Sequence, residues 1–329
     1  MTNDTIPRVN WVDIIDKCKS VKSRVDREIE RAAIETGVFL VTELPDLDSG
    51  KTKAEHLLSF FDLDQTEKTL IENRRSNPQG THAYRGYSKQ SVANLSKTVW
   101  DSEMYEIGPS SYTTTSDVAG IEELTEPNIW PKVEPFFGWK KAMESYYHRL
   151  NRVGFSILSA IARVANLPES VLSAKFKHGP STLRLLNYQA LEEIKFSKAT
   201  DSNIREHPLI VGPPHTDACG LSLIWQNDTG LQIKSESQEW TDIPKLNDSV
   251  SVHFGESLQI LTNNIFKQTI HQVVGGLHTR RSLCFFLEPS LHATLEHANI
   301  KRGQKKDTNI ITYADLLLSR RKSVSNREP

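Results

Sequence analysis

The chain lacks an excess of charge of either sign. Its 329 residues include 40 lysines and arginines against 41 aspartates and glutamates, which gives a formal net charge of −1. Because nucleic-acid-binding proteins usually carry an excess of positive charge or a basic face, this balance argues against a nucleic-acid partner. The longest basic run is Arg320-Arg321-Lys322, and we expect it to be part of a solvated tail.

Cysteines and long apolar stretches are also scarce. The three cysteines, Cys18, Cys219 and Cys284, are too few and too widely spaced for a disulfide framework, and the absence of Cys-x-x-Cys disfavours a structural zinc site. No stretch approaches the roughly 18 apolar residues that span a bilayer, and the polar start from Met1 to Val9 does not look like a signal peptide. We therefore expect a soluble, cytoplasmic, monomeric protein with no membrane partner.

The pattern of apolar residues predicts helices first and strands later. Helical spacing occurs over residues 16–36, over 53–72, in a long stretch between Pro131 and Pro168, and again over 313–320, whereas 75–130 reads as loops with short elements. Short strands are expected at 38–41, 183–188, 220–226, 230–233, 249–254, 257–261, 269–274 and 282–287, with Asn227–Gly230 as a hairpin turn. Many short strands favour a sandwich or barrel, so the predicted fold class is α+β. No linker is visible. We expect one structural unit, in which a mixed N-terminal region (1–105) precedes a long helix and a β-rich core (106–329).

The segment His215-Thr216-Asp217 carries the clearest chemical signal. On an extended strand, residues two apart project to the same face, so this imidazole and this carboxylate can converge on one ion. His271, in a later strand-like run, is the best candidate for a third ligand. Two histidines and one carboxylate leave open coordination positions, a set that suits non-heme Fe(II). A His-x-Asp triplet alone is a weak motif, and a histidine packed in the core or exposed at the surface is the commoner case.

Arg280-Arg281-Ser282 is the second signal. In a strand, Arg280 and Ser282 share one face while Arg281 faces the other way. A guanidinium beside a hydroxyl near a metal is suited to a carboxylate, because arginine offers a permanent charge and a bidentate fork. The alternative for a lone arginine is a surface ion pair.

These motifs together resemble one known family. His215-x-Asp217, 53 intervening residues, His271 and then Arg280-x-Ser282 are similar to the iron(II)- and 2-oxoglutarate-dependent dioxygenases, in particular the isopenicillin N synthase-like branch. Further similar segments cover most of the chain: Ile6-Pro7, Gly37-Val38-Phe39, Arg85-Gly86-Tyr87, Glu103 to Gly108, Leu183 to Tyr188, and Gly255 to Gln259. Gln189 stands where the family usually has proline, and Glu256 where it usually has aspartate.

The resemblance implies a fold, cofactors and residue roles. The fold would be a double-stranded β-helix, or jelly roll, with helices packed outside. His215, Asp217 and His271 would bind Fe(II), and Arg280 and Ser282 would bind the distal carboxylate of 2-oxoglutarate. Tyr188 matches a tyrosine that contacts either the co-substrate or the substrate. With O₂, such an enzyme releases succinate and CO₂ while it hydroxylates, desaturates or cyclises a small molecule, of which an amino-acid-derived metabolite of specialised metabolism is one example.

Substrate contacts are the least constrained part of the prediction. The residues expected there are Arg85, Tyr87, Arg205, Ser222, Ile224 and Trp225. Residues 191–212 form a long irregular stretch that we interpret as a lid, and its Lys195, Lys198 and Arg205 indicate an anionic substrate. A solvated loop explains these charges equally well, and a core position explains Trp225.

Two other functions compete with this interpretation. An oxidase of the same fold would use iron and O₂ without 2-oxoglutarate, and the Arg-x-Ser pair does not exclude it. A non-catalytic jelly-roll module would bind a ligand without any reaction. A nucleophilic hydrolase is disfavoured, because the sequence contains no Gly-x-Ser-x-Gly element.

Overall fold

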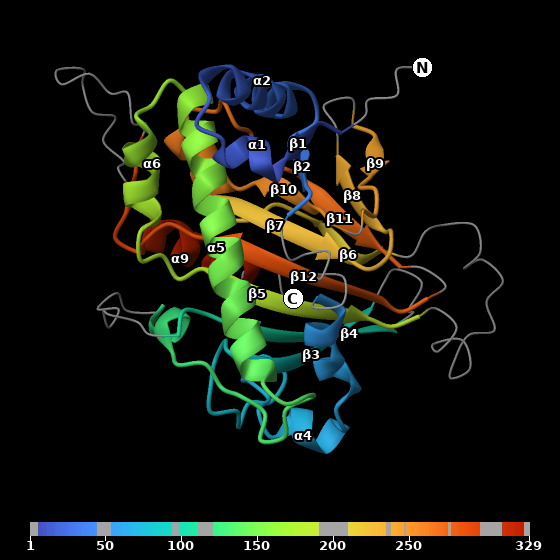
Figure 1. Cartoon of the computed structure of the whole chain (residues 1–329). Helices are drawn as coiled ribbons and strands as arrows, with labels where there is room; N and C mark the ends of the chain where they lie inside the picture. The colour runs from blue at the N-terminus through green and yellow to red at the C-terminus, as the bar shows by residue number, and fades with distance from the viewer. Residues whose placement is uncertain are drawn as a thin grey trace.

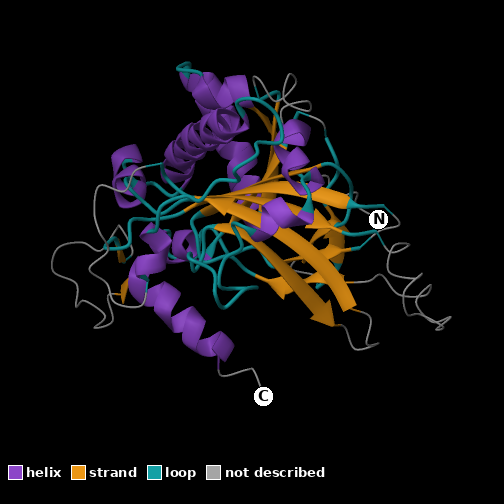
Figure 2. Ribbon diagram, turned by 90° about the horizontal axis from the view of Figure 1, so that it is seen from below, coloured by secondary structure: helices purple, strands orange, loops and turns teal. Residues whose placement is uncertain are grey.

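The structure of the chain is a computed structural model that describes residues 6–44, 54–93, 99–110, 121–190, 210–234, 238–246, 248–275, 278–296 and 311–325. Two stacked sheets form its centre, and most of the helices gather on one side of the strands (Figure 2). Among the described helices, none combines the length and the apolar composition needed to cross a membrane.

Eight of the described strands form the larger sheet. Their spatial order is β1-β2-β10-β7-β12-β5-β4-β3, and all neighbours except the parallel pair β1–β2 run antiparallel. The bounds are β1 Arg8–Asn10, β2 Val38–Thr42, β3 Gly86–Ala93, β4 Val99–Ile107, β5 Thr182–Tyr188, β7 Leu221–Gln226, β10 Val250–Phe254 and β12 Arg280–Leu287.

A smaller sheet of four described strands faces the larger one. Its order is β6-β11-β8-β9, with β6 Ile210–His215, β8 Leu231–Lys234, β9 Trp240–Asp242 and β11 His271–Val274. A third, two-stranded ribbon pairs β13 (Thr294–Leu295) with β14 (Ile311–Thr312). Consecutive strands alternate between the two main sheets, as β10, β11 and β12 do, which is the double-stranded β-helix implied by the resemblance.

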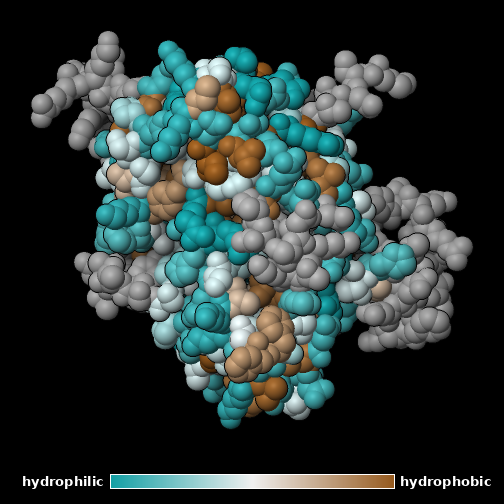
Figure 3. All heavy atoms as spheres, in the orientation of Figure 1, coloured by the Kyte–Doolittle hydropathy of each residue, from teal (hydrophilic) through white to brown (hydrophobic). Residues whose placement is uncertain are grey.

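The helices cover the outer face of the larger sheet. The long helix α5 (Trp139–Val164) crosses the strands β7, β12 and β5, and α2 (Lys19–Glu35) and α6 (Glu169–Phe176) pack beside it (Figure 1). Other helices are α1 (Trp11–Ile15), α4 (Gln65–Thr69), α8 (Glu256–Leu261), α9 (Tyr313–Ser325) and the 3₁₀ turns η1 (Ser59–Asp62) and η2 (Glu122–Thr125), and residues 54–58 are helical as well. In the same orientation, Figure 3 shows a largely hydrophilic surface with small hydrophobic patches.

Helix α5 forms because its sequence has an apolar stripe at helical spacing. Met143, Leu150, Ile157 and Ile161 lie on that stripe and are fully or nearly fully buried. The helix ends where Asn166 adopts the left-handed conformation (φ 54°) and the amide of Leu167 donates to the carbonyl of Ala162. This six-to-one bond satisfies a terminal carbonyl, and the proline that follows prevents continuation.

The larger sheet therefore has two different faces. Alternate residues such as Leu183, Leu185 and Trp225 belong to the main core beneath the helices. Their neighbours, such as Leu186, Tyr188 and Ile224, belong to a second core between the two sheets. Because side chains alternate along a strand, one strand can supply both the structural core and the lining of an internal cavity.

Several sequence predictions differ from the structure. Residues 86–93 and 99–107 are strands of the larger sheet, where loops with short elements were expected. The segment 257–261 lies in helix α8 rather than in a strand. Asn227–Gly230 joins β7 to β8, which lie in different sheets, so it is a crossover between sheets and not a hairpin turn. Most of the expected lid, residues 191–209, lies outside the described residues, and 210–212 begin β6.

Candidate active site

Two neighbouring strands of the smaller sheet bring the three candidate metal ligands together. His215 is the last residue of β6, and His271 is the first residue of β11, directly opposite His215 in the antiparallel register. Asp217 lies just past the end of β6, in the turn that leads toward β7. The His-x-Asp spacing predicted that both residues of the triplet lie on one strand. In the structure, the carboxylate reaches the imidazoles from the turn.

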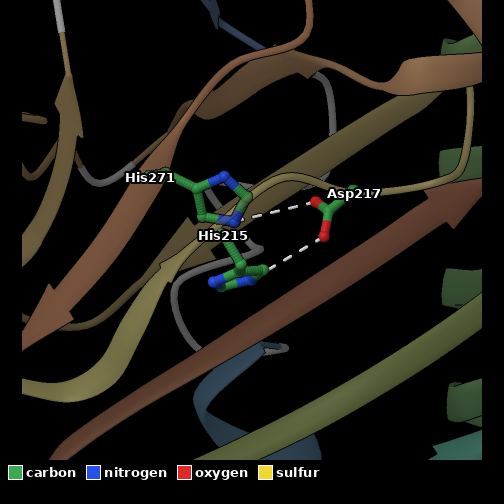
Figure 4. A group of neighbouring side chains, drawn as sticks. All are labelled: His215, Asp217 and His271. Carbon is green, nitrogen blue, oxygen red and sulfur yellow. Dashed lines mark ion pairs between the residues drawn. The ribbon is translucent and has the colours of Figure 1, made fainter. Parts of the chain in front are cut away.

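The donor atoms of this triad are close to one another. His215 Nε2 lies 3.8 Å from Asp217 Oδ1, and His271 Nε2 lies 3.7 Å from Asp217 Oδ2. Both rings and the carboxylate point toward one point in space (Figure 4), and the three ligand atoms lie within 4.8 Å of one another. Metal bonds of about 2.1 Å at right angles place donors about 3 Å apart, so small side-chain adjustments would let the triad hold one ion.

Hydrogen bonds orient each ligand. Nδ1 of His215 lies 2.7 Å from the carbonyl oxygen of Pro213, and Nδ1 of His271 lies 3.1 Å from that of Thr269. Because a carbonyl can only accept, both Nδ1 atoms donate, and each Nε2 keeps its lone pair for a metal. The hydroxyl of Ser222 donates to Asp217 Oδ2 at 2.5 Å and fixes the carboxylate.

The electrostatics suit a cation. Burial and the neighbouring His271 lower the pKa of His215, which favours its neutral, metal-binding form. Burial alone would raise the pKa of Asp217, but the charges of His271 and His215 and the hydroxyl of Ser222 outweigh it and hold that pKa below its usual range. These shifts favour a neutral imidazole at His215 and an ionised carboxylate at Asp217.

The C-terminal helix supports the turn between the first two ligands. The Arg320 guanidinium donates to the carbonyl oxygen of Thr216 at 2.7 Å and to its hydroxyl at 3.0 Å. It also forms an ion pair of 2.6 Å with Glu256, whose backbone amide donates to the carbonyl of Asp217 at 2.8 Å. The main chain on both sides of Thr216 is thus held from behind.

Arg280 lies in the same cavity and has no anionic partner among the described residues. Its side chain is almost fully buried, and its Nη2 donates to the amide oxygen of Gln226 at 2.8 Å. Within the described part of the chain, its Nε has no hydrogen-bond partner. Ser282 Oγ is 3.5 Å from Nη1, and the Tyr188 ring centroid is 5.3 Å from the guanidinium carbon. Burial lowers the pKa of Arg280, as expected for a cation without a counter-ion. This side chain can receive a carboxylate from a ligand.

One cavity of about 180 Å³ contains all of these groups. It is lined by the triad and by Arg280, Ser282, Tyr188 and Ile224, all of which the sequence had singled out. Five further residues line the same cavity and were not expected there: Met104, Arg184, Leu186, Cys284 and Phe286. Strand alternation was the available signal for Arg184, because it lies four residues before Tyr188 and on the same face of β5.

Four of the expected substrate-contact residues do not line this cavity. Arg85 is fully buried and donates to the hydroxyl of Thr182 and the carbonyl of Leu124. Tyr87 and Trp225 pack in the main core beneath the helices, because they project from the outer face of the larger sheet. Ser222 contacts Asp217 rather than lining the cavity, and Arg205 lies outside the described residues.

Comparison with known proteins agrees with this geometry. The family model described as "2OG-Fe(II) oxygenase superfamily" matches residues 182–289, the segment that contains all three triad residues, Arg280 and Ser282. This segment is about a third of the chain, and the curated relatives described below support the same superfamily. The isopenicillin N synthase-like branch is compatible with the matches. The match and the relatives indicate an Fe(II)- and 2-oxoglutarate-dependent oxygenase, which disfavours the non-catalytic binding module.

Curated relatives and solved structures extend the likeness over nearly the whole chain. The chain is 24% identical to the 2-oxoglutarate-dependent dioxygenase frbJ of Dothideomycetidae sp., over 95% of this chain and 85% of that protein. It is 26% identical to the proline hydroxylase buaE of Petromyces alliaceus, over 87% and 88% of the two chains. A full-length Neurospora crassa protein, solved in complex with alpha-KG and thymine, has a similar fold, with a TM-score of 0.77 and 21% identity over 98% and 99% of the chains.

Proposed function

We propose that this oxygenase oxidises a C–H bond of a small organic molecule and couples that step to the decarboxylation of 2-oxoglutarate to succinate and CO₂. In this proposal His215, Asp217 and His271 bind Fe(II), while Arg280, Ser282 and Tyr188 bind the distal carboxylate of 2-oxoglutarate. The observation that carries it is the presence, in one cavity, of a 2-His-1-carboxylate triad and a buried arginine without an anionic partner among the described residues.

Each group has a physical task in this scheme. Bound Fe(II) supplies the redox chemistry with O₂. Pro213 and Thr269 hold the imidazoles in the tautomer that leaves Nε2 free, and Ser222 holds the carboxylate. Arg280 orients the co-substrate by a charge-assisted bond to its far end, since a guanidinium binds a carboxylate bidentately. The apolar side chains of Leu186, Ile224 and Val273 keep water from the reacting groups.

The relatives favour a small substrate from specialised metabolism. A fungal proline hydroxylase is among them, which supports hydroxylation of an amino-acid-derived molecule, with desaturation and oxidative cyclisation as the other outcomes of the same chemistry. The Neurospora crassa protein bound to thymine supports a substrate of similar size.

The proposal is tested by two measurements on the full chain. The first is succinate formation with Fe(II), 2-oxoglutarate and O₂ present, where the slow turnover expected without substrate should be abolished by His271→Ala. The second is calorimetric titration of Mn(II), an O₂-inert replacement for Fe(II), where His271→Ala should weaken binding at least tenfold. His148→Ala, which removes an exposed histidine on α5, is the matched control and should change neither result.

Two results would contradict the proposal. Unchanged Mn(II) affinity in His271→Ala would reject the metal assignment. Oxidation of a substrate by the wild-type enzyme without any succinate would instead favour the iron oxidase that does not use 2-oxoglutarate.

A further inference from the structure

A second arginine faces the cavity and is built differently from Arg280. Arg184 lies on β5, and its side chain is 25% exposed, into the cavity that the triad lines. Its Nε donates to Glu106 Oε1 at 2.6 Å, whereas its two terminal nitrogens have no hydrogen-bond partner among the described residues. One edge of the guanidinium is thus held by protein, and the other edge is open to a ligand.

The charges around Arg184 leave a positive excess. Glu106 has a fully buried side chain and accepts from two guanidiniums, Arg184 on one oxygen and Arg75 on the other at 2.7 Å. One carboxylate cannot neutralise two permanent cations. Glu106 therefore fixes the position of Arg184 without cancelling the positive charge of the pair. An anion from solution would complete the balance in a region where water screens poorly.

The guanidinium is also fixed in its plane. Its central carbon lies 4.8 Å from the centroid of the Phe286 ring, and Phe286 lines the cavity as well. A planar cation that is anchored at Nε and packed on an aromatic ring loses little freedom when it binds a second carboxylate. This arrangement differs from a solvated surface arginine, which must be ordered at the moment of binding.

The strand register separates Arg184 from Arg280. Arg280 is opposite Tyr188, whereas Arg184 is opposite Cys284, four residues further along β12, or about 13 Å. Phe286 is two residues beyond Cys284 on β12 and is opposite Ser222, whose hydroxyl donates to Asp217. The metal triad therefore lies at the Arg184 end of the cavity. A co-substrate held by Arg280 would therefore leave Arg184 free for a different anion.

We propose that Arg184, fixed by Glu106 and Phe286, binds an anionic group of the substrate, and that the substrate is a small carboxylate with an apolar body. This assignment rests on the proposed function, since it takes Arg280 as the co-substrate site. Met104, Leu186 and Phe286 line the cavity near this position and would contact the apolar body.

The test compares acids with their uncharged amides. Benzoate, phenylacetate and 3-phenylpropionate are titrated into the full chain loaded with Mn(II) and 2-oxoglutarate, and the three primary amides of these acids are titrated in parallel. We expect at least one acid to bind at least tenfold more tightly than its amide. Arg184→Gln should weaken binding of that acid about 10- to 100-fold, the usual effect of removing a charge-assisted hydrogen bond. Arg184→Lys should give an intermediate loss, because lysine keeps the charge but cannot contact Glu106 and a ligand carboxylate through a planar fork.

Controls separate this proposal from the function on which it rests. Arg24→Gln removes an exposed arginine paired with Asp13 and should leave every affinity unchanged. Arg184→Gln should still bind Mn(II) and 2-oxoglutarate as the wild type does, which also shows that it is folded.

If the wild type binds Mn(II) and 2-oxoglutarate but none of the acids, or binds acids and amides equally, the substrate assignment is overturned and the proposed function stands. Equal binding of the acid by Arg184→Gln and the wild type would also overturn it and would leave the Glu106 contacts a purely structural ion pair. Failure of the wild type to bind 2-oxoglutarate would reject the proposed function and, with it, this assignment.

Discussion

Replacing Arg280 by methionine should separate ligand binding from folding. Arg280 is 3% exposed, the groups it contacts are neutral, and its Nε has no hydrogen-bond partner among the residues that the structure describes. Methionine is unbranched and flexible enough to fill the same space without the charge. The variant therefore removes the group that the proposal assigns to the co-substrate while disturbing the packing little.

The expected magnitudes follow from these contacts. Loss of one partner of a buried, hydrogen-bonded charge pair costs about 2–5 kcal/mol, so 2-oxoglutarate affinity should fall about 30- to 4,000-fold. Stability of the ligand-free protein responds to two opposed effects. Removing a buried charge stabilises by about 1–4 kcal/mol, whereas the Gln226 amide oxygen, which accepts from Arg280, loses its partner at a cost of about 1–3 kcal/mol. The free energy of unfolding should therefore stay within about 3 kcal/mol of the wild-type value.

The adjacent arginine provides a matched control. Arg281 faces away from the cavity, and it donates to the side chain of Asn187 at 3.0 Å and forms an ion pair of 2.6 Å with Asp62. Arg281→Met should lower the free energy of unfolding by about 1–3 kcal/mol, because the buried Asn187 loses a partner. Its affinity for 2-oxoglutarate should stay within about twofold of the wild type, since no contact to the cavity is removed.

Two measurements on each variant decide the outcome. Calorimetric titration of 2-oxoglutarate in the presence of Mn(II) gives the affinity, and urea unfolding without ligand gives the stability. If Arg280→Met retained wild-type affinity, the carboxylate of 2-oxoglutarate would have to bind elsewhere. If Arg281→Met lost the affinity instead, the assignment of the two strand faces would be refuted.

Three further substitutions test the supports of the site. In Gly255→Ala, the new Cβ would lie 1.9 Å from the carbonyl oxygen of Cys219, just after the turn that holds Asp217. This substitution should destabilise the fold by about 1–3 kcal/mol in urea unfolding and should weaken Mn(II) binding. Arg320→Gln removes the hydrogen bond that holds the backbone at Thr216, so it should weaken Mn(II) binding about tenfold in calorimetry with a small effect on stability. An unchanged Mn(II) affinity would show that this contact serves folding alone. Burial would raise the pKa of Glu106, but the guanidiniums around it hold that pKa below its usual range. The ionised Glu106 therefore stabilises the fold above about pH 4.3, and this stabilisation is lost as the pH falls through the lower pKa of the folded state. Urea unfolding from pH 7 to pH 3 should show this acid-side loss in the wild type and a smaller one in Glu106→Gln, and equal slopes would refute it.

The sequence predicted the chemistry of the site better than its walls. The triad and the Arg-x-Ser pair could be recognised because a metal and a carboxylate require particular residue types at particular spacings. The cavity walls depend on which face of a strand each residue occupies. Ile224 lines the cavity while Trp225, one residue later, packs under the helices, and this difference of one residue is set by a register that the sequence does not state.

Strands β3 and β4 were missed for a related reason. Their polar residues come in runs, Ser88 to Ser91 and Asp101 to Glu103, rather than in alternation with apolar ones. Several of these polar residues are nevertheless buried. Glu103, for example, accepts from Lys68 at 2.7 Å and from Asn187 at 2.7 Å on the helix-covered face. A buried charge of this kind is stable only with partners from distant segments, and a single sequence does not reveal those partners.

The two faces of the larger sheet divide stability from binding. On the helix-covered face the polar groups are paired with one another, as Glu103 is with Lys68, Tyr87 and Asn187, and as Asn187 is with Arg281. On the cavity face, the arginines Arg280 and Arg184 keep donors without partners among the described residues. Buried donors cost free energy unless something accepts from them, so the cavity face is less stable empty than filled. Anionic ligands should therefore stabilise this fold by more than their contact area suggests, and substitutions one residue apart on β12 should affect different properties of the protein.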